Sequence, residues 1–181
     1  MRSVLLTQEP VWQTNCQLPN HIKPWINETG SLTKRLRSIY GSGVSVTVLS
    51  QSWRVPFISE CRLLNTREQR VCLVREVMLH LNNTPLVLAR TVIPRTSLKI
   101  NHHLTHLGSR PLGEVIFAYP TLKRVVSQSS LIQPSLWTDQ AQQLAHIQQA
   151  VWGRRTVYQI NYKQLLVSEF FLPTLQNYEY Y

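Results

Sequence analysis

Acidic residues are the scarcest chemical group in this sequence. The 181 residues include nine carboxylates against 19 lysines and arginines, and Asp139 is the only aspartate. Phosphoryl transfer with Mg²⁺ and EF-hand calcium binding both need clustered carboxylates, so the sequence argues against them. The net charge of +10 either reflects a basic surface that binds nothing specific or attracts anions, which could be nucleic acid or a small anionic substrate.

Cysteines and long apolar runs are also few. Cys16, Cys61 and Cys72 are an odd number without the spacing of a metal site, which predicts free thiols in a reducing compartment. The N-terminus has too short an apolar run for a secretory signal, and no run approaches the ~20 apolar residues of a membrane span. We therefore expect a cytoplasmic protein without stable membrane insertion.

Several familiar motifs are missing. The phosphate-binding loop and the G-x-S-x-G nucleophile elbow do not occur, and Val46 stands where a G-x-G-x-x-G motif starting at Gly41 needs its third glycine. Helix-turn-helix spacing, zinc-ligand spacing and aromatic RNA-binding signatures are absent too. We therefore expect no nucleic-acid partner.

Three histidines lie close together at His102, His103 and His106. Their spacing is not that of an established metal site, and no acidic residue or cysteine lies near them in the sequence. We expect an ordinary helix surface here and no metal.

The chain length suits a single domain, spanning residues 1–181. Residues 1–24 predict an irregular lead-in with at most a short helix. Ser31 is a candidate N-cap for a helix that reaches Tyr40 and ends at Gly41. The remaining expectations are strands at 44–49, 121–126, 156–160 and 165–172, a helix within 136–151, a loop or a poorly paired strand at 51–67, and a loop at 127–135.

Two apolar runs on either side of Asn82 and Asn83 predict a β-hairpin. Arg75 and Arg90 each interrupt an apolar row, and a two-residue loop would place them opposite each other. Like charges across a strand pair are destabilising, and arginine does not give up its proton. Either an anionic group, from a Glu or a ligand carboxylate, lies between them, or both side chains reach the sheet edge and solvent.

The strand at 165–172 is apolar on both faces, which predicts a central, covered strand with Glu169 buried in it. A buried carboxylate must be paired or protonated, so Glu169 is either the partner of an arginine or a group aimed at a ligand. Leu32 and Leu112 each follow a helix-start signal. Their backbone N–H groups could bind an anion, or the signals could be simple caps.

Six short segments, in this order, resemble the chorismate pyruvate-lyase family of ubiquinone biosynthesis. The resemblance covers residues 25–173. The segments are GSLTKR at 30–35, REV at 75–77, ARTVIP at 89–94, LGSRPLG at 107–113, WGRR at 152–155 and EFFLP at 169–173.

The resemblance implies an α+β fold. A six-stranded antiparallel sheet would carry helices packed on one side, and two lid loops would close over a buried ligand site. Residues 174–181 would be an added C-terminal tail. The resemblance also implies cleavage of chorismate to 4-hydroxybenzoate and pyruvate by a monomer with no cofactor. The alternative is a sensor domain of the same fold, which binds an aromatic carboxylate without turnover.

The resemblance also assigns the site residues. Arg75 matches the arginine that holds the ligand carboxylate, and Glu169 matches the glutamate that meets the ring hydroxyl. Leu32 and Leu112 match the two backbone donors, although the family often has methionine where Leu32 stands. Arg90 is a further substrate-binding candidate, by our own inference, for the second carboxylate of chorismate.

Overall fold

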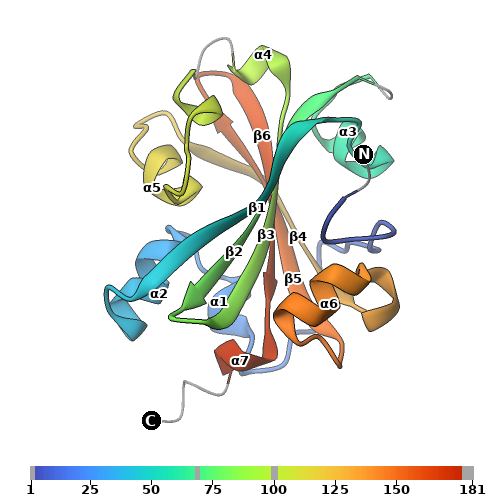
Figure 1. Ribbon diagram of the computed structural model, residues 1–181. Helices are drawn as coiled ribbons and strands as arrows, with labels where there is room; N and C mark the ends of the chain where they lie inside the picture. Colours follow the sequence, from blue (N-terminus) through green and yellow to red (C-terminus); the bar gives the residue numbers. More distant parts are fainter. Residues whose placement is uncertain (1–2, 68–69, 99–101, 177–181) are drawn as a thin grey trace.

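One antiparallel sheet of six strands organises the molecule. The computed structural model describes residues 3–67, 70–98 and 102–176. The strand order is β1-β2-β3-β6-β5-β4, and every neighbouring pair is antiparallel (Figure 1). This confirms the expected α+β class. The strands are β1 Val44–Arg54, β2 Cys72–Leu81, β3 Thr84–Ile93, β4 Lys123–Ile132, β5 Val151–Ile160 and β6 Lys163–Phe171.

The helices are short, the longest having nine residues. No helix in the described ranges is long and apolar enough to cross a membrane. They are α1 Lys23–Ile26, α2 Leu32–Tyr40, α3 Ile58–Leu63, α4 Arg95–Leu98, α5 Leu112–Ile116, α6 Asp139–Ala145 and α7 Pro173–Gln176, with 3₁₀ turns η1 His102–Thr105 and η2 Pro134–Leu136.

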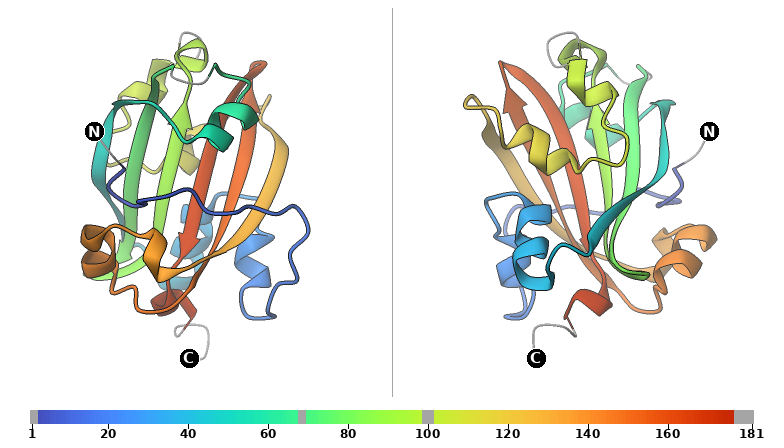
Figure 2. Two further views of the ribbon diagram at one scale, coloured as in Figure 1. Left: turned by 90° about the vertical axis from the view of Figure 1, so that its right-hand side faces the viewer. Right: turned by 60° about the vertical axis from the view of Figure 1, so that its left-hand side comes forward.

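Both faces of the sheet are covered. Side chains alternate along a strand, so the neighbours Phe170 and Phe171 enter different cores. Phe171 packs with α1 and α2 on the side that we call the α2 face. Phe170 packs with the N-terminal segment and α6 on the α6 face, where α3 also lies (Figure 2). We expected helices on one side of the sheet. The structure has helices on both, because α3 and α6 cover the second side.

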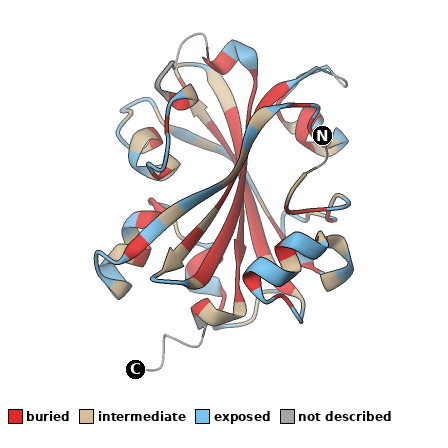
Figure 3. Cartoon of the chain, in the orientation of Figure 1, coloured by how far each residue is buried: buried red, intermediate tan, exposed pale blue. Residues whose placement is uncertain are grey.

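The two central strands form the spine of the core. β3 and β6 are buried along nearly their whole length (Figure 3), whereas the edge strand β1 is buried only at its first and last residues. A strand buried on both faces explains the continuous apolar run at 165–172. The prediction of a central, covered strand is confirmed.

Local signals predicted α2 well. The Ser31 hydroxyl accepts a hydrogen bond from the Lys34 amide at 3.3 Å, and Gly41 ends the helix with a φ of 79°. The limits of other elements differ from prediction. β1 runs on through Arg54, and α3 follows where a loop or a poorly paired strand was expected.

The polar stretch predicted as a loop after residue 126 continues β4 to Ile132 instead. Its residues pair along β5, and an edge strand tolerates polar side chains on its exposed face. The helix predicted within 136–151 is confined to α6, because Val151 already opens β5.

The β2–β3 hairpin contains one residue more on β3 than on β2. Leu81 faces Thr84 as predicted, but His80 pairs with Pro85 while Leu79 pairs with Val87, so Leu86 is the extra residue of a bulge. Beyond it Arg75 faces Thr91, and the predicted pairing of Arg75 with Arg90 is wrong. Because a one-residue slip reverses side-chain direction, the two arginines point to opposite faces.

Candidate active site

A cavity of about 50 Å³ lies on the α2 face, where α2 and α5 begin. Leu32 from α2, Leu112 from α5 and Glu169 from β6 all line it, so the structure brings three of the predicted site residues together. The remaining wall is mostly apolar. It consists of Thr33, Leu79, Ala89, Gly113, Ile116, Phe117, Tyr158 and Val167.

The two helix starts meet at this cavity. Leu32 and Leu112 are the first residues of α2 and α5, where backbone N–H groups have no acceptor within the helix. A Cβ atom on Gly113 would lie 2.7 Å from the Ser31 hydroxyl oxygen, so only glycine allows this approach. Further out, an exposed ion pair between Arg37 and Glu114 joins the same two helices.

Glu169 is held by a buried arginine. Arg154 lies directly opposite it on β5, and the Arg154 Nε donates to Glu169 Oε2 at 2.5 Å. Burial opposes the charge of Arg154, but Glu169 outweighs burial and raises the pKa of Arg154 above its usual value. The structure thus confirms that Glu169 is the partner of an arginine, and Glu169 also lines the cavity.

The sequence analysis did not identify Arg154 as this partner, although a signal was available. Asn161 and Tyr162 form a two-residue turn, so Ile160 faces Lys163. Counting back from that turn places Arg154 opposite Glu169. The count succeeds because the β5–β6 pairing has no bulge.

Tyr158 and Phe117 form an aromatic wall between sheet and helix. Their ring centroids are 5.8 Å apart in an edge-to-face arrangement, which packs the end of α5 against β5. Burial, followed by the charge of Glu169, raises the pKa of Tyr158, so its phenol is neutral at physiological pH. The aromatic wall therefore adds no charge to the cavity.

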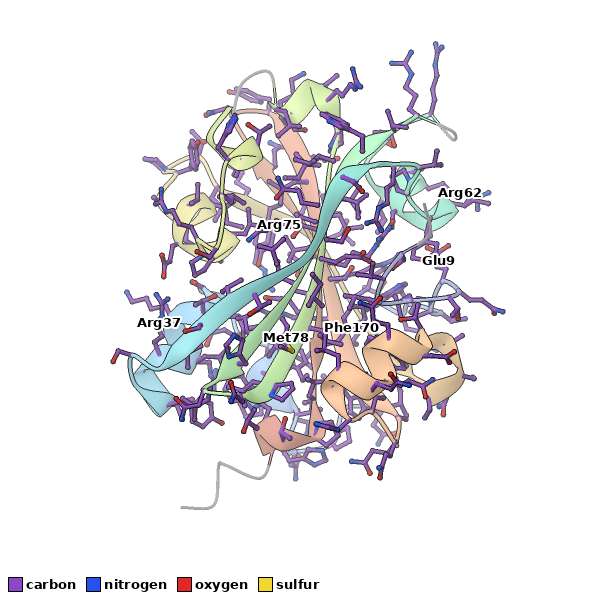
Figure 4. The ribbon with its side chains drawn as sticks, in the orientation of Figure 1. Glu9, Arg37, Arg62, Arg75, Met78 and Phe170 are labelled. Atoms are coloured by element: carbon purple, nitrogen blue, oxygen red, sulfur yellow. The ribbon has the colours of Figure 1, made fainter. Side chains whose placement is uncertain are left out.

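Arg75 shares the α2 face but is not among the residues that line the cavity as it is formed here. Its side chain is 3% exposed and points to the side covered by α5 (Figure 4). It donates to Gln51 Oε1 at 3.0 Å and to the Arg110 carbonyl at 3.4 Å. Burial lowers the pKa of Arg75, and within the described ranges no carboxylate pairs with it. Arg75 is thus a buried cation with neutral partners.

Arg90 belongs to a different environment, on the α6 face. It donates to both oxygens of Glu60, at 2.8 and 3.0 Å, and to Glu76 Oε1 at 2.9 Å. Glu76 also accepts from Arg54 at 3.1 Å. The anion expected beside the hairpin arginines is therefore supplied to Arg90 by two glutamates. The structure does not bring Arg90 together with the other predicted site residues.

The histidine segment gives no sign of a metal site in the part of the chain that the structure describes. Among the residues that the structure describes, no group of three or more His, Cys, Asp and Glu side chains is placed to hold a metal ion. The side chains of His102 and His103 lie outside the described residues.

Comparison with known proteins identifies relatives of similar length. A protein-family model described as chorismate lyase matches residues 6–180. A "Probable chorismate pyruvate-lyase" of Methylococcus capsulatus is 41% identical and aligns over 85% of this chain and 96% of its own. A protein of the same description from Aromatoleum aromaticum is 36% identical over 88% of each chain.

Solved structures share the fold at low sequence identity. The effector domain of PhnF from Mycobacterium smegmatis has a TM-score of 0.58 at 12% identity, covering 81% of this chain and 91% of that domain. The ligand-binding domain of a GntR-family regulator from Bordetella bronchiseptica has a TM-score of 0.55 at 11% identity, covering 73% and 87%. The regulators show the fold alone, whereas the sequence matches are specific: this chain belongs to the chorismate lyase family.

Proposed function

We propose that this protein is a chorismate pyruvate-lyase that converts chorismate to 4-hydroxybenzoate and pyruvate without a metal or organic cofactor. The observation that carries the proposal is that a buried arginine and a buried glutamate lie on the same face of the sheet, one suited to bind a carboxylate and the other a hydroxyl. Arg75 is a buried cation without a described acidic partner, and Glu169 is a carboxylate with one edge open to an apolar cavity. A small ring with a carboxylate and a hydroxyl satisfies both.

In the proposed complex the ring carboxylate binds Arg75 and the amides of Leu32 and Leu112. Arg75 would exchange its bonds to Gln51 and the Arg110 carbonyl for the ligand, gaining a charge-assisted partner. Two helix starts beside an arginine favour a negative group. The ring would pack among the apolar walls, and its hydroxyl would donate to Glu169.

The reaction itself needs little covalent help. The C3–O bond breaks, and the hydrogen on C4 passes to the methylene carbon of the departing enolpyruvyl group, which becomes pyruvate. The ring becomes aromatic, so the step is strongly downhill. Holding the side chain near C4 and excluding water are then the main tasks of the protein. The mostly apolar cavity, with its polar contacts confined to a few groups, suits those tasks.

The test is incubation of purified protein with chorismate. We expect equal amounts of 4-hydroxybenzoate and pyruvate, measured by chromatography and by a coupled pyruvate assay, with no effect of EDTA. A mock purification from cells that do not express the protein reports any contaminating lyase. Unchanged chorismate together with tight binding of 4-hydroxybenzoate would favour the sensor alternative. Loss of activity with EDTA would contradict the cofactor-free reaction.

The family resemblance also guides the biological setting that we propose. The protein would act as a cytoplasmic monomer, without a nucleic-acid partner, and would supply 4-hydroxybenzoate to ubiquinone synthesis.

A further inference from the structure

We propose that Arg154 is a positioning residue that keeps Glu169 ionised, so that Glu169 serves only as a hydrogen-bond acceptor for the ligand hydroxyl. The identity of the ligand rests on the proposed function. The role of Arg154 rests on its own contacts, which join three parts of the chain at the edge of the cavity.

The first contact fixes one oxygen of the carboxylate. Arg154 Nε lies 2.5 Å from Glu169 Oε2, with side chains only 1% and 11% exposed. An opposite charge at this distance favours the ionised form of a buried carboxylate. Within the described part of the chain no donor bonds Oε1, while Glu169 lines the cavity. One oxygen is therefore anchored and the other is available to a ligand.

The second contact fixes the arginine from its other side. Arg154 Nη1 donates to the carbonyls of Trp25 at 3.0 Å, Ile26 at 3.3 Å and Glu28 at 2.6 Å. These carbonyls lie in and just beyond α1, where helix-end carbonyls need partners. With Nε and Nη1 both bonded, the guanidinium of Arg154 is held beside Glu169.

The same contact reaches the start of α2. Glu28 Oε1 accepts from the Gly30 amide at 2.6 Å, and Glu28 Oε2 accepts from Arg35 at 2.8 Å. Burial favours neutral Glu28, but the Gly30 amide and then Arg35 outweigh it and lower the pKa of Glu28. Arg154 thereby links the Glu169 carboxylate to the segment that presents the Leu32 amide.

An ionised Glu169 limits the chemistry of the site. It can accept the hydrogen bond of the C4 hydroxyl, but it has no proton to give to the departing ether oxygen. The balanced step above needs none, since the C4 hydrogen ends on the methylene carbon and the C3–O electrons remain with the pyruvate oxygen. The contacts of Arg154 therefore assign Glu169 to orientation and exclude it as a general acid.

The test compares Arg154→Met with wild type in binding 4-hydroxybenzoate and benzoate, by calorimetry between pH 5.5 and 8. Benzoate lacks the hydroxyl. Without Arg154 the buried Glu169 carboxylate loses the positive charge that pairs with it. We expect affinity for 4-hydroxybenzoate to fall about tenfold, the loss of one hydrogen bond to a charged group, and to weaken further as the pH falls. Benzoate should bind both proteins alike, with no such pH dependence.

Two further variants sharpen the comparison. Arg154→Lys keeps a positive charge and should retain the flat pH profile of the wild type. Arg155→Met is the matched control, because Arg155 is the next residue of β5, is also buried, and bonds Gln128 and Ser59 on the α6 face. It should leave the preference for 4-hydroxybenzoate over benzoate unchanged.

Equal weakening of both ligands with a flat pH profile in Arg154→Met would overturn the proposal and leave a purely structural arginine. If that variant does not fold, ¹³C-glutamate NMR of the wild type decides, with the Glu169 signal assigned through Glu169→Gln. An ionised signal at pH 6 supports the proposal, and a protonated one contradicts it. Because these measurements use binding alone, failure of the wild type to convert chorismate would reject the proposed reaction without deciding the role of Arg154.

Discussion

At the scale of single residues, the neutral partners of Arg75 make a sharp prediction. Arg75→Ala should lower the affinity for 4-hydroxybenzoate roughly ten- to hundredfold, because a charge-assisted hydrogen bond is worth about 1.5–3 kcal/mol. Arg75→Lys should recover only part, since a point charge does not match a carboxylate bidentately. Titration calorimetry measures the affinity, and thermal unfolding checks that the fold persists.

Lys123→Ala is the control for a change in net charge, because Lys123 is exposed on the edge strand β4. It should bind as the wild type does. If Arg75→Ala unfolds the protein, or binds 4-hydroxybenzoate with wild-type affinity, Arg75 is not the carboxylate anchor.

At the scale of elements, the starts of α2 and α5 are open to a substitution that removes one backbone N–H without breaking the helix. Proline is tolerated at the first position of a helix, and the preceding residue must then be extended. Pro111, with a ψ of 130°, and Ser31, with a ψ of 116°, already are. Leu112→Pro should therefore keep the fold but weaken 4-hydroxybenzoate binding about tenfold, whereas Leu112→Ala should have a milder effect.

Leu32→Pro and Leu32→Ala should show the same order of effects. The comparison within each pair separates the amide from the side chain, because alanine removes only the side chain. Equal, mild losses of affinity for alanine and proline would argue against a role for either backbone donor. Circular dichroism of each variant tests whether the helices are retained.

Most of the strands could be predicted from alternating apolar residues and from turn signals in the sequence. The apolar rows predicted both hairpin strands, the face of each arginine within its own strand, and the central position of β6. The extra residue Leu86 was not predicted, because a bulge leaves the local apolar pattern unchanged. Pro85, which has no N–H to give to the ladder, was the available hint. The covering of the α6 face depends on packing between distant segments, which local patterns do not encode.

At the scale of the whole molecule, stability should depend on pH through a buried thiol. Burial, then Cys61 and Glu60, raises the pKa of Cys72 to about 11 from its ordinary value of 9.0. The unfolded chain therefore loses this proton first. The free energy of unfolding should fall as the pH rises from about 9 to about 11, and the contribution should be fully present below pH 9. Urea unfolding at a series of pH values measures it.

Cys72→Ala removes this titration while keeping a small side chain in the core, so its stability should change less across the same interval. Parallel curves for wild type and variant would show that other groups control the alkaline limb. Tyr158, whose pKa is also raised, is the first of these to test by Tyr158→Phe.

Because of the bulge at Leu86, Arg75 and Arg90 lie on opposite faces of the sheet and have different partners. On one face the protein's own glutamates neutralise Arg90, and on the other face Arg75 has neutral partners and, in the function proposed above, binds the ligand carboxylate. The placement of the two arginines on opposite faces depends on the number of residues in the hairpin, not on the identity of any one side chain. Substitutions at Leu86 preserve the count, whereas deletion of a single residue there would return Arg75 and Arg90 to the same side as rivals for one anion. The number of residues in the hairpin thus determines which face of the sheet each arginine occupies.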